Sequence, residues 1–336
     1  MDGAFGAPGR TLSHWPGNHT PSELKHALST GIACNFVRLS ADDQAHFLKG
    51  LCAVVNNHFD TDGLMALFAL YHPDLALVHS ERLIEWASAG DFFWVPSQEA
   101  FAVDQLVQLY VDPLQSPLPE VRAASSTEER YRLTTLGLFA RIPGWLEHGL
   151  GAETERVARA VERLQSDQAQ LNATPGVPLV HLDLMVWTLP LGHAPLPGRH
   201  ALFQAAQSDR VLVLAPTAQG TRVRFLISTL SWFDLPERKA LPRPDLARLV
   251  ERLNSLEGLK ETAEHAWRAQ STQTASPELW FGASALPMFA THADEELGSS
   301  RLDLAQIKAE ILEALRSAWV FENEEDTGDL EDIFAV

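Results

Sequence analysis

The pattern of apolar and polar positions changes about halfway along the chain. In the first half, a continuous apolar run at residues 51–55 precedes a polar loop and a longer apolar run from Gly63 to Leu70, which ends before Pro73. A short apolar run followed by a longer one is typical of a buried strand and a helix. This order favours a parallel α/β sheet, in which ligands bind at the carboxyl edge of the strands.

Helical periodicity then dominates from about Gln98 to Leu171, and the proline- and glycine-rich segment 172–178 predicts a domain boundary. The second half has a different pattern, with strand-like runs at 177–190, 209–216 and 221–235 and helical runs at 242–258 and 303–321. We therefore predict an α/β protein. Residues 1–174 form a parallel-sheet domain with a helical segment, and residues 175–321 form a smaller mixed α/β domain.

Charge separates the end of the chain from its body. The chain has 44 Asp and Glu residues against 26 Lys and Arg, a formal net charge of -18. Residues 322–336 carry seven of these acids and no Lys or Arg, so we predict a disordered, solvated acidic tail there. The remaining acidic surface repels polyanions, which argues against binding to duplex nucleic acid. A local metal cleft can still accept a small phosphorylated molecule.

Three further features bear on the compartment. The two cysteines, Cys34 and Cys52, are too few for a disulfide scaffold. No apolar run approaches the ~18 residues that span a bilayer, and the opening segment does not have the basic and apolar regions of a secretory signal. We therefore expect a cytoplasmic protein without membrane contact. The sequence leaves its oligomeric state open.

The polar loop after the first predicted strand carries the strongest candidate chemistry. Its sequence NNHFDTDG places His58, Asp60 and Asp62 at every second position, and such side chains share one face of an extended chain. An imidazole and two carboxylates suit a divalent ion such as Mn²⁺, Mg²⁺, Co²⁺ or Zn²⁺. We predict these three residues as metal ligands. The alternative is a polar turn in which Asp62 caps the following helix.

Two other segments could contribute to that site. Asp91, in AGDFFWVP, lies between small and aromatic residues, so we expect a partly desolvated acid that needs a metal, an arginine or a backbone donor. We add it to the three predicted ligands; the alternative is a role at a helix end. His14 lies in SHWPGN, where the turn at Pro16 and Gly17 either folds its side chain over the site or belongs to a packed arm anchored by Trp15.

A basic spot in the second half is a candidate for substrate binding. The segment SWFDLPERKALPRPDL contains Ser231, Arg238, Lys239 and Arg243. Because a guanidinium group can contact phosphate through two parallel hydrogen bonds, we predict that Arg238, Arg243 and Ser231 bind the substrate. The alternative is a surface loop with solvated charges.

The run VVNNHFDTDGLMALFAL resembles the first motif of the DHH phosphoesterase superfamily, and SAGDFF is similar to its later aspartate motifs. By this resemblance, His58, Asp60 and Asp62 bind Mn²⁺ or Mg²⁺, and the N-terminal domain is a DHH-like, Rossmann-like parallel sheet. The Asp-His-His triplet of that superfamily does not occur in the sequence. The combination of HWPGN, NHFDTDG, AGDFF and SWFDLP also resembles an uncharacterised bacterial family of unknown function.

These features predict a metal-dependent phosphoester hydrolase of DHH-like type that acts on a small phosphorylated or nucleotide substrate. In this hypothesis His58, Asp60, Asp62 and Asp91 hold Mn²⁺ or Mg²⁺, and the ion activates water and polarises a phosphoryl oxygen. The alternative, favoured by the missing triplet, is a non-catalytic α/β ligand-binding or regulatory protein with a degenerate metal site.

Overall fold

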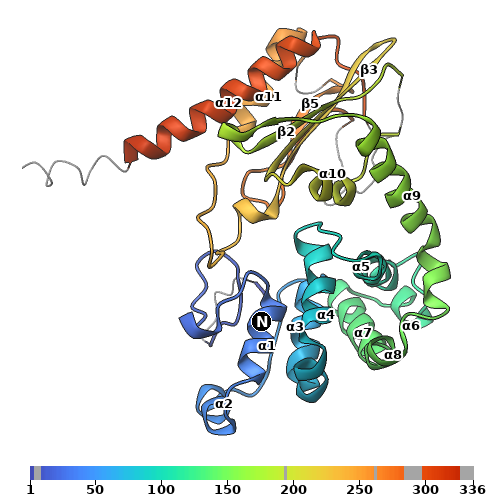
Figure 1. Ribbon diagram of the computed structural model, residues 1–336, viewed down its shortest axis with the longest axis vertical. Helices are drawn as coiled ribbons and strands as arrows, with labels where there is room; N and C mark the ends of the chain where they lie inside the picture. Colours follow the sequence, from blue (N-terminus) through green and yellow to red (C-terminus); the bar gives the residue numbers. More distant parts are fainter. Residues whose placement is uncertain (4–8, 193–194, 261–262, 284–296, 326–336) are drawn as a thin grey trace, which may run out of the picture. The chain divides into compact units, whose positions relative to one another are not determined.

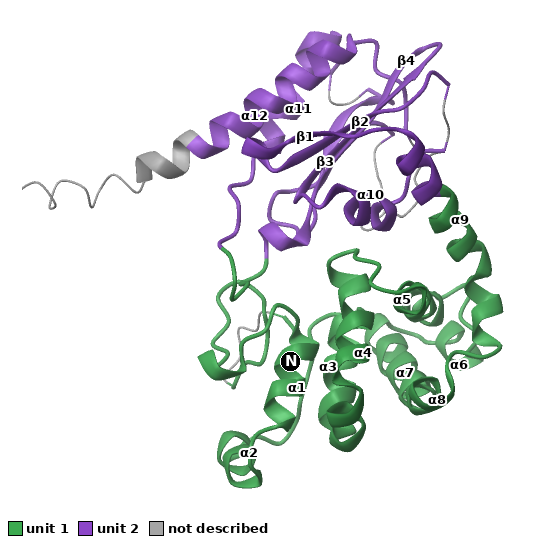
Figure 2. Cartoon of the chain, in the orientation of Figure 1, with its two compact units in different colours: residues 1–166, 233–238 green, residues 167–232, 239–336 purple. Residues whose placement is uncertain are grey.

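The computed structural model describes residues 1–3, 9–192, 195–260, 263–283 and 297–325. The chain divides into two compact units, shown in Figure 2. Unit 1 comprises residues 1–166 together with the later segment 233–238, and unit 2 comprises residues 167–232 and 239–336. The segment 233–238, which contains most of the SWFDLP motif, therefore belongs to unit 1.

Unit 1 is helical (Figure 1). Its helices are η1 (Ser22–Leu24), α1 (Ser29–Val37), α2 (Ala41–Leu48), α3 (Thr61–Tyr71), α4 (Pro73–Asp91), α5 (Gln98–Val111), α6 (Pro119–Arg122), α7 (Thr127–Phe139), α8 (Ile142–His148) and the first part of α9 (Glu153–Ala173). Short polar side chains begin several of them. Ser40, Ser97 and Ser126 each accept a hydrogen bond from a backbone N–H in the first turn of the helix that follows.

The core of unit 1 is built around α3 and α4. Helix α3 packs against α1 and α4, and α4 packs against α5. Because α3 is apolar on most of its surface, neighbouring helices bury its side chains, and Leu64, Met65 and Phe68 are 2% exposed or less. On α4, Trp86 is fully buried. This packing holds the start of α3 and the end of α4 in place beside α1.

The predicted strand at residues 51–55 is wrong. These residues have no regular structure, and Val54 and Val55 are 49% and 57% exposed. Among the described residues of unit 1 there is no strand, so the parallel sheet and the DHH-like architecture predicted for residues 1–174 are not found. The physical reason is that a run of five apolar residues becomes a strand only if a partner strand pairs with it, and here packed helices form the core instead.

Unit 2 contains a mixed six-stranded sheet in the order β1-β2-β3-β4-β6-β5. Its strands are β1 (Val177–Leu179), β2 (Leu184–Thr188), β3 (Arg210–Thr217), β4 (Gly220–Ile227), β5 (Ala266–Ala269) and β6 (Glu278–Gly282). Only β2 and β3 are parallel among these neighbours, and helix α10 (Arg199–Ala206) lies between them in sequence, as a parallel crossover requires. The mixed α/β character predicted for the second half is confirmed.

Helices α11 (Leu246–Glu257) and α12 (Leu304–Glu325) complete unit 2, together with the short helices η2 (Val180–Leu182) and η3 (Thr229–Ser231). Helix α11 packs against β5 and α12. Side chains such as Leu253 and Ile311 share one buried cluster with Phe225 of the sheet. The largely buried strands β3 and β4 and the amphipathic helix α11 therefore contribute to one apolar core.

Two predicted boundaries can be compared with the elements. Helix α9 ends at Ala173 and β1 begins at Val177, so a break between elements falls within the predicted linker at 172–178, whereas the units divide inside α9, after residue 166. The domain boundary at residues 174/175 stays a prediction. Helix α12 ends at Glu325, within the first residues of the predicted acidic tail. The rest of the predicted acidic tail lies outside the described residues.

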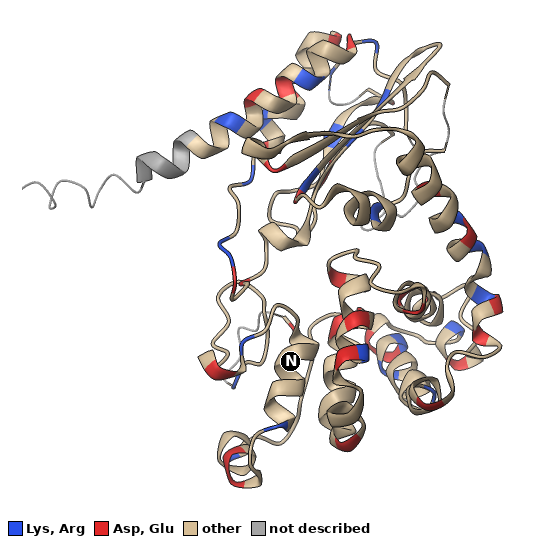
Figure 3. Cartoon of the chain, in the orientation of Figure 1, with Lys and Arg blue, Asp and Glu red and all other residues tan. Residues whose placement is uncertain are grey.

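Acidic and basic side chains are interspersed along the helices of both units (Figure 3). The long helices α4, α9 and α12 all carry charged residues. Accordingly, in the part of the chain that the structure describes, no helix has both the length and the apolar character needed to cross a membrane.

Candidate metal centre

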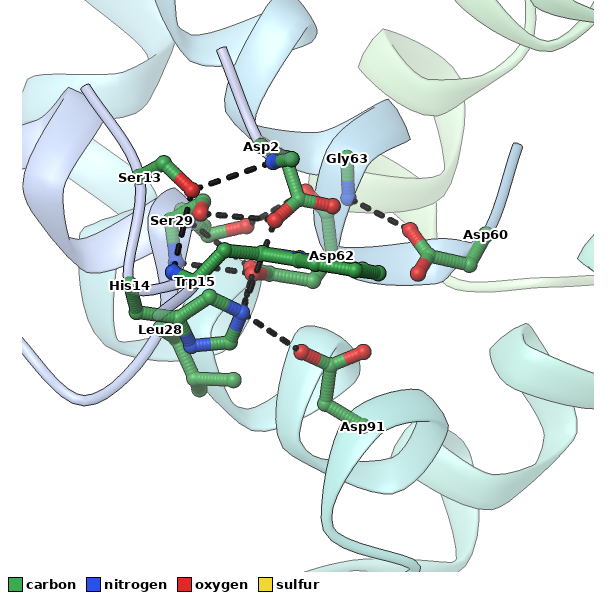
Figure 4. Close-up of polar contacts among 12 residues, drawn as sticks. Asp2, Ser13, His14, Trp15, Leu28, Ser29, Asp60, Asp62, Gly63 and Asp91 are labelled. Carbon is green, nitrogen blue, oxygen red and sulfur yellow. Dashed lines mark hydrogen bonds and ion pairs between the residues drawn. The ribbon is translucent and has the colours of Figure 1, made fainter. Parts of the chain in front are cut away.

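Segments that are far apart in sequence meet in one cluster inside unit 1 (Figure 4). They are the first residues of the chain, the HWPGN turn, the NNHFDTDG loop and the end of α4. We call the group the acid–histidine cluster, and its members are Asp2, His14, His58, Asp60, Asp62 and Asp91. The structure thus brings together the four predicted metal ligands and adds an aspartate and a histidine to them.

The start of α3 gives its two aspartates different roles. Asp60 is the N-cap of α3, and its Oδ1 accepts a hydrogen bond from Gly63 N at 2.8 Å. Asp62 is fully buried in the first turn, where its carboxylate accepts hydrogen bonds from the backbone N–H groups of Ser29 at 2.7 Å and Thr30 at 2.8 Å. An aspartate does cap α3, but it is Asp60, whereas Asp62 caps the neighbouring helix α1.

The HWPGN turn places His14 inside the cluster. Its Nδ1 bonds to the carbonyl oxygen of Ala27 at 2.5 Å, a contact in which Nδ1 carries the proton. Its Nε2 therefore faces the carboxylates, at 3.2 Å from Asp91 Oδ2, 3.4 Å from Asp2 Oδ1 and 3.7 Å from Asp62 Oδ2. The residue is 1% exposed, and Nε2 makes no hydrogen bond to any described residue.

The segment 233–238 covers His14 from the other side. The ring of Phe233 stacks on the imidazole with a centroid distance of 3.8 Å, and Asp234 N donates to His14 O at 2.8 Å. The Asp234 carboxylate also accepts a hydrogen bond from Lys25 Nζ at 2.6 Å. The SWFDLP motif thus holds the HWPGN turn against the cluster. Asn18 of that turn donates a hydrogen bond to the Asp234 carboxylate, although 216 positions separate the two residues in sequence.

The half of the cluster around His58 is nearer to solvent. His58 Nε2 lies 2.8 Å from Asp60 Oδ2 and 3.2 Å from Asp2 Oδ2, and its Nδ1 lies 2.6 Å from Asn57 Oδ1. The His58 and Asp60 side chains are 29% and 28% exposed, whereas Asp2 is 1% exposed. The cluster therefore has a buried half around His14 and a half-exposed half around His58, and Asp2 belongs to both.

Asp2 is the cluster residue that sequence reasoning missed. Its Oδ1 accepts a hydrogen bond from Ser29 Oγ at 2.8 Å. The following Gly3 has φ +126°, and a Cβ there would lie 2.2 Å from Asn57 Oδ1, so only glycine lets the chain pass this close to the loop. No spacing rule links Asp2 to the distant loop, and its single local signal is the Asp-Gly pair itself.

Gly63, the glycine of NNHFDTDG, leaves space that the carboxylates use. A Cβ at this position would lie 2.5 Å from Asn56 Nδ2, 3.0 Å from Asp2 Oδ2 and 3.1 Å from Asp60 Oδ1. The glycine therefore allows two acidic side chains to approach the first turn of α3 together. A larger residue would push at least one of them away.

Asp104 was also missed by the sequence analysis. It is 3% exposed on α5, and its Oδ1 accepts a hydrogen bond from Thr61 Oγ1 at 2.7 Å. Thr61 lies between Asp60 and Asp62, so this bond helps to fix the direction of both. The available signal was an acid within the largely apolar run VDQLVQLYV.

The electrostatics of the cluster reflect an excess of buried carboxylates. Burial and the neighbouring carboxylates raise the pKa of Asp62 to about 6 and raise the pKa of Asp91 well above its usual value. Burial opposes the charged form of both imidazoles, but the carboxylates outweigh it, raising the pKa of His58 to about 12 and that of His14 well above its usual range. The six residues include no Lys or Arg, so protons are the positive charges that the protein itself supplies.

The donor set fits a divalent cation. Ligand atoms lie within 4.8 Å of one another in each of two triads, Asp2–His14–Asp62 and Asp2–His58–Asp60. Ligands held ~2.0–2.2 Å from an ion are separated by roughly 3–3.6 Å, close to the 3.2–3.7 Å that His14 Nε2 keeps from its carboxylate neighbours. In metal sites, a histidine ligand is commonly oriented by a hydrogen bond from its other ring nitrogen to a backbone carbonyl or a carboxylate, and the bond from His14 Nδ1 to Ala27 O is of this type.

The predicted substrate-binding residues do not belong to the acid–histidine cluster. Arg243, in unit 2, donates to Ser231 Oγ at 3.1 Å and to the backbone carbonyls of Thr272 at 2.8 Å and Ala275 at 2.6 Å. Burial lowers the pKa of Arg243 to about 10. Arg238 lies at the exposed end of the segment 233–238. The contacts of Arg243 tie backbone segments together, and a phosphate-binding role for these residues stays a prediction.

Comparison with known proteins gives one family. The sequence model of a family described as a family of unknown function (DUF6687) matches residues 1–326. This confirms the predicted resemblance to an uncharacterised family, and no comparison supports the resemblance to the DHH superfamily. Searches of curated proteins and of solved structures gave no match.

Proposed function

We propose that this chain, which belongs to the family of unknown function DUF6687, is a divalent-metal-dependent phosphoester hydrolase. One observation carries the proposal. The Nε2 atom of the buried His14 has no hydrogen-bond partner in the described residues and faces the carboxylates of Asp2, Asp62 and Asp91. These carboxylates are buried beside one imidazole with no Lys or Arg in the cluster, so a divalent cation shared with them would offset the cost of burying their charge.

The chemistry of the donors narrows the ion and the substrate. Carboxylate-rich sites with one or two imidazoles suit Mn²⁺ and Mg²⁺, ions that also take phosphoryl oxygens as ligands. When bound, such an ion lowers the pKa of a coordinated water and polarises the phosphoryl oxygen. The substrate reaches the cluster from the side of His58 and Asp60, whose side chains are 29% and 28% exposed. A small phosphorylated molecule or nucleotide fits this approach better than a polyanion, because the protein is acidic overall.

The first test is metal content and turnover of the full chain. Protein incubated with Mn²⁺ or Mg²⁺ and then desalted should retain bound ion, and it should hydrolyse p-nitrophenyl phosphate or bis-p-nitrophenyl phosphate only when the divalent ion is also present in the assay. Asp91→Asn keeps the shape of the side chain but removes a charge, so it should lower both retained metal and turnover at least tenfold. His148→Ala is the matched control, since His148 is an 80% exposed histidine outside the cluster.

Two results would count against this function. Failure to bind any divalent ion at micromolar concentration would remove the metal centre. Retained metal without turnover of any phosphoester or nucleotide would instead favour the non-catalytic ligand-binding alternative.

A further inference from the structure

We infer that the acid–histidine cluster holds two divalent ions that share Asp2, a firmly bound ion in the buried half and an exchangeable ion in the half-exposed half. A catalytic role for the two ions rests on the proposed function, but the number of bound ions and their exchange rates can be measured without any assay of turnover.

The first argument is the orientation of the Asp2 carboxylate. Its Oδ1 lies 3.4 Å from His14 Nε2, whereas its Oδ2 lies 3.2 Å from His58 Nε2. Each oxygen therefore faces a different imidazole, and Asp2 is common to both triads of candidate ligands. A carboxylate in this position can bridge two ions, which in paired-metal sites lie ~3.5–4 Å apart.

The second argument is the state of the atoms that point into each half. Asp2 is 1% exposed, and its Oδ2 makes no hydrogen bond to the residues that the structure describes, although it lies at ion-pair distance from His58. His14 Nε2 is in the same state in the buried half. Each half thus contains one buried atom, His14 Nε2 or Asp2 Oδ2, that makes no hydrogen bond and can coordinate an ion. Two ions, one in each half, would coordinate both atoms more directly than a single shared ion.

The third argument is the difference in exposure, which makes the two ions unequal. The buried half takes its donors from separate segments of the chain, and His14, Asp2 and Asp62 are each 1% exposed or less. An ion there is enclosed by protein ligands. In the other half, His58 and Asp60 are 29% and 28% exposed, which leaves coordination positions for water and substrate, as catalytic metal sites require. The ion in this half should therefore exchange readily.

The experiment counts Mn²⁺ ions in the full-length protein. Titration calorimetry should find two sites in the wild type, and desalting should remove only the weaker ion. Asp60→Asn should bind one Mn²⁺ and keep it through desalting, because Asn caps a helix nearly as well as Asp but gives no negative charge. Electron paramagnetic resonance should show a spin-coupled Mn²⁺ pair in the wild type and an uncoupled ion in Asp60→Asn.

His58→Ala provides a second variant if Asp60→Asn does not fold, as judged by its melting temperature, and it should also bind one ion. His148→Ala should bind two. A single Mn²⁺ in the saturated wild type, or two ions in both Asp60→Asn and His58→Ala, would overturn the inference while leaving a one-ion hydrolase intact. Two ions without any turnover would leave the inference standing and count against the proposed function.

Discussion

Both units bury charged groups, but unit 2 pairs its buried carboxylate with arginines, whereas the cluster of unit 1 has only histidines as cationic partners. In unit 2, Glu278 accepts hydrogen bonds from Arg224 at 2.5 and 3.0 Å and from Arg199 at 2.9 Å, and all three side chains are 2% exposed or less. In unit 1, the six residues of the acid–histidine cluster have four carboxylates and no arginine or lysine. A buried carboxylate held by two arginines is typical of a structural ion network, whereas several buried carboxylates without Lys or Arg form a candidate cation site.

The pKa values of Glu278 and Asp62 shift in opposite directions, although within the cluster the pKa of Asp2 is also lowered, because His14 and His58 outweigh the effect of its burial. For Glu278, burial is outweighed by Arg224 and Arg199, which lower its pKa. For Asp62, burial and the neighbouring carboxylates raise the pKa to about 6. A carboxyl group next to arginine side chains stays ionised. A carboxyl group next to other carboxylates keeps its proton to a higher pH, unless a bound metal ion replaces that proton.

The largest expected effect comes from breaking the Glu278 network. Glu278→Gln removes the carboxylate charge that the buried guanidinium groups of Arg199 and Arg224 share, so we expect a loss of ~3–5 kcal/mol in the free energy of unfolding. Urea denaturation measures this, with the exposed Glu251→Gln as the control that should change little. Folded Glu278→Gln protein should still bind Mn²⁺. A loss below 1 kcal/mol would contradict the structural role assigned to the network.

The second prediction concerns the effect of Mn²⁺ binding on the stability of the acid–histidine cluster. Mn²⁺ at a free concentration of about 100 times its Kd should add ~2.7 kcal/mol to the free energy of unfolding, because the ion binds the folded state. The measurement is the melting temperature with Mn²⁺ and then with a chelator. Asp91→Asn should respond much less than the wild type. An identical response in both proteins would show that Asp91 does not hold the bound ion.

The third prediction concerns pH. Since the pKa of Asp62 is about 6 in the folded protein against an ordinary 3.8, the folded state holds the proton more tightly than the unfolded state. The metal-free protein should therefore lose stability as pH rises from about 4 to 6, by on the order of 2 kcal/mol from this group.

Glu278 works in the opposite sense, because its lowered pKa contributes stability that disappears as pH falls below the ordinary glutamate range. The two contributions can be separated by comparing the wild type with Asp62→Asn in urea melts from pH 4 to 7. A contribution from Asp62 that grows with pH would contradict the prediction.

The smallest effect is expected from relieving repulsion in the metal-free cluster. Asp91→Asn removes one carboxylate from a group of four, so without metal it should raise the free energy of unfolding by about 1 kcal/mol. The comparison is made in the presence of chelator, and Mn²⁺ should reverse the order of the two proteins. If Asp91→Asn is less stable than the wild type under both conditions, the contacts of this carboxylate, among them the ion pair with His14, outweigh the repulsion.

The sequence by itself determined a large part of unit 2 and the location of the candidate chemistry. Strands β3 and β4 and helix α11 follow from local period and turn signals, because each is defined by residues close in sequence. The loop with His58, Asp60 and Asp62 stands out for the same reason, since a histidine and two acids next to a helix start exceed what a cap needs. In unit 1 the helices expected between Gln98 and Leu171 are present, but the predicted strand and parallel sheet are wrong, because a short apolar run carries no information about whether a partner strand exists.

Only the tertiary structure decided which residues join that loop. Asp2 reaches the cluster because Gly3 passes within contact distance of Asn57, and His14 is turned inward by Ala27 on one side and Phe233 on the other. These contacts connect positions that are distant in sequence, so no local pattern can encode them. Side-chain chemistry identified candidate cation ligands, but long-range packing selected the ones that meet, because the approach of buried carboxylates depends on the whole core that holds them together.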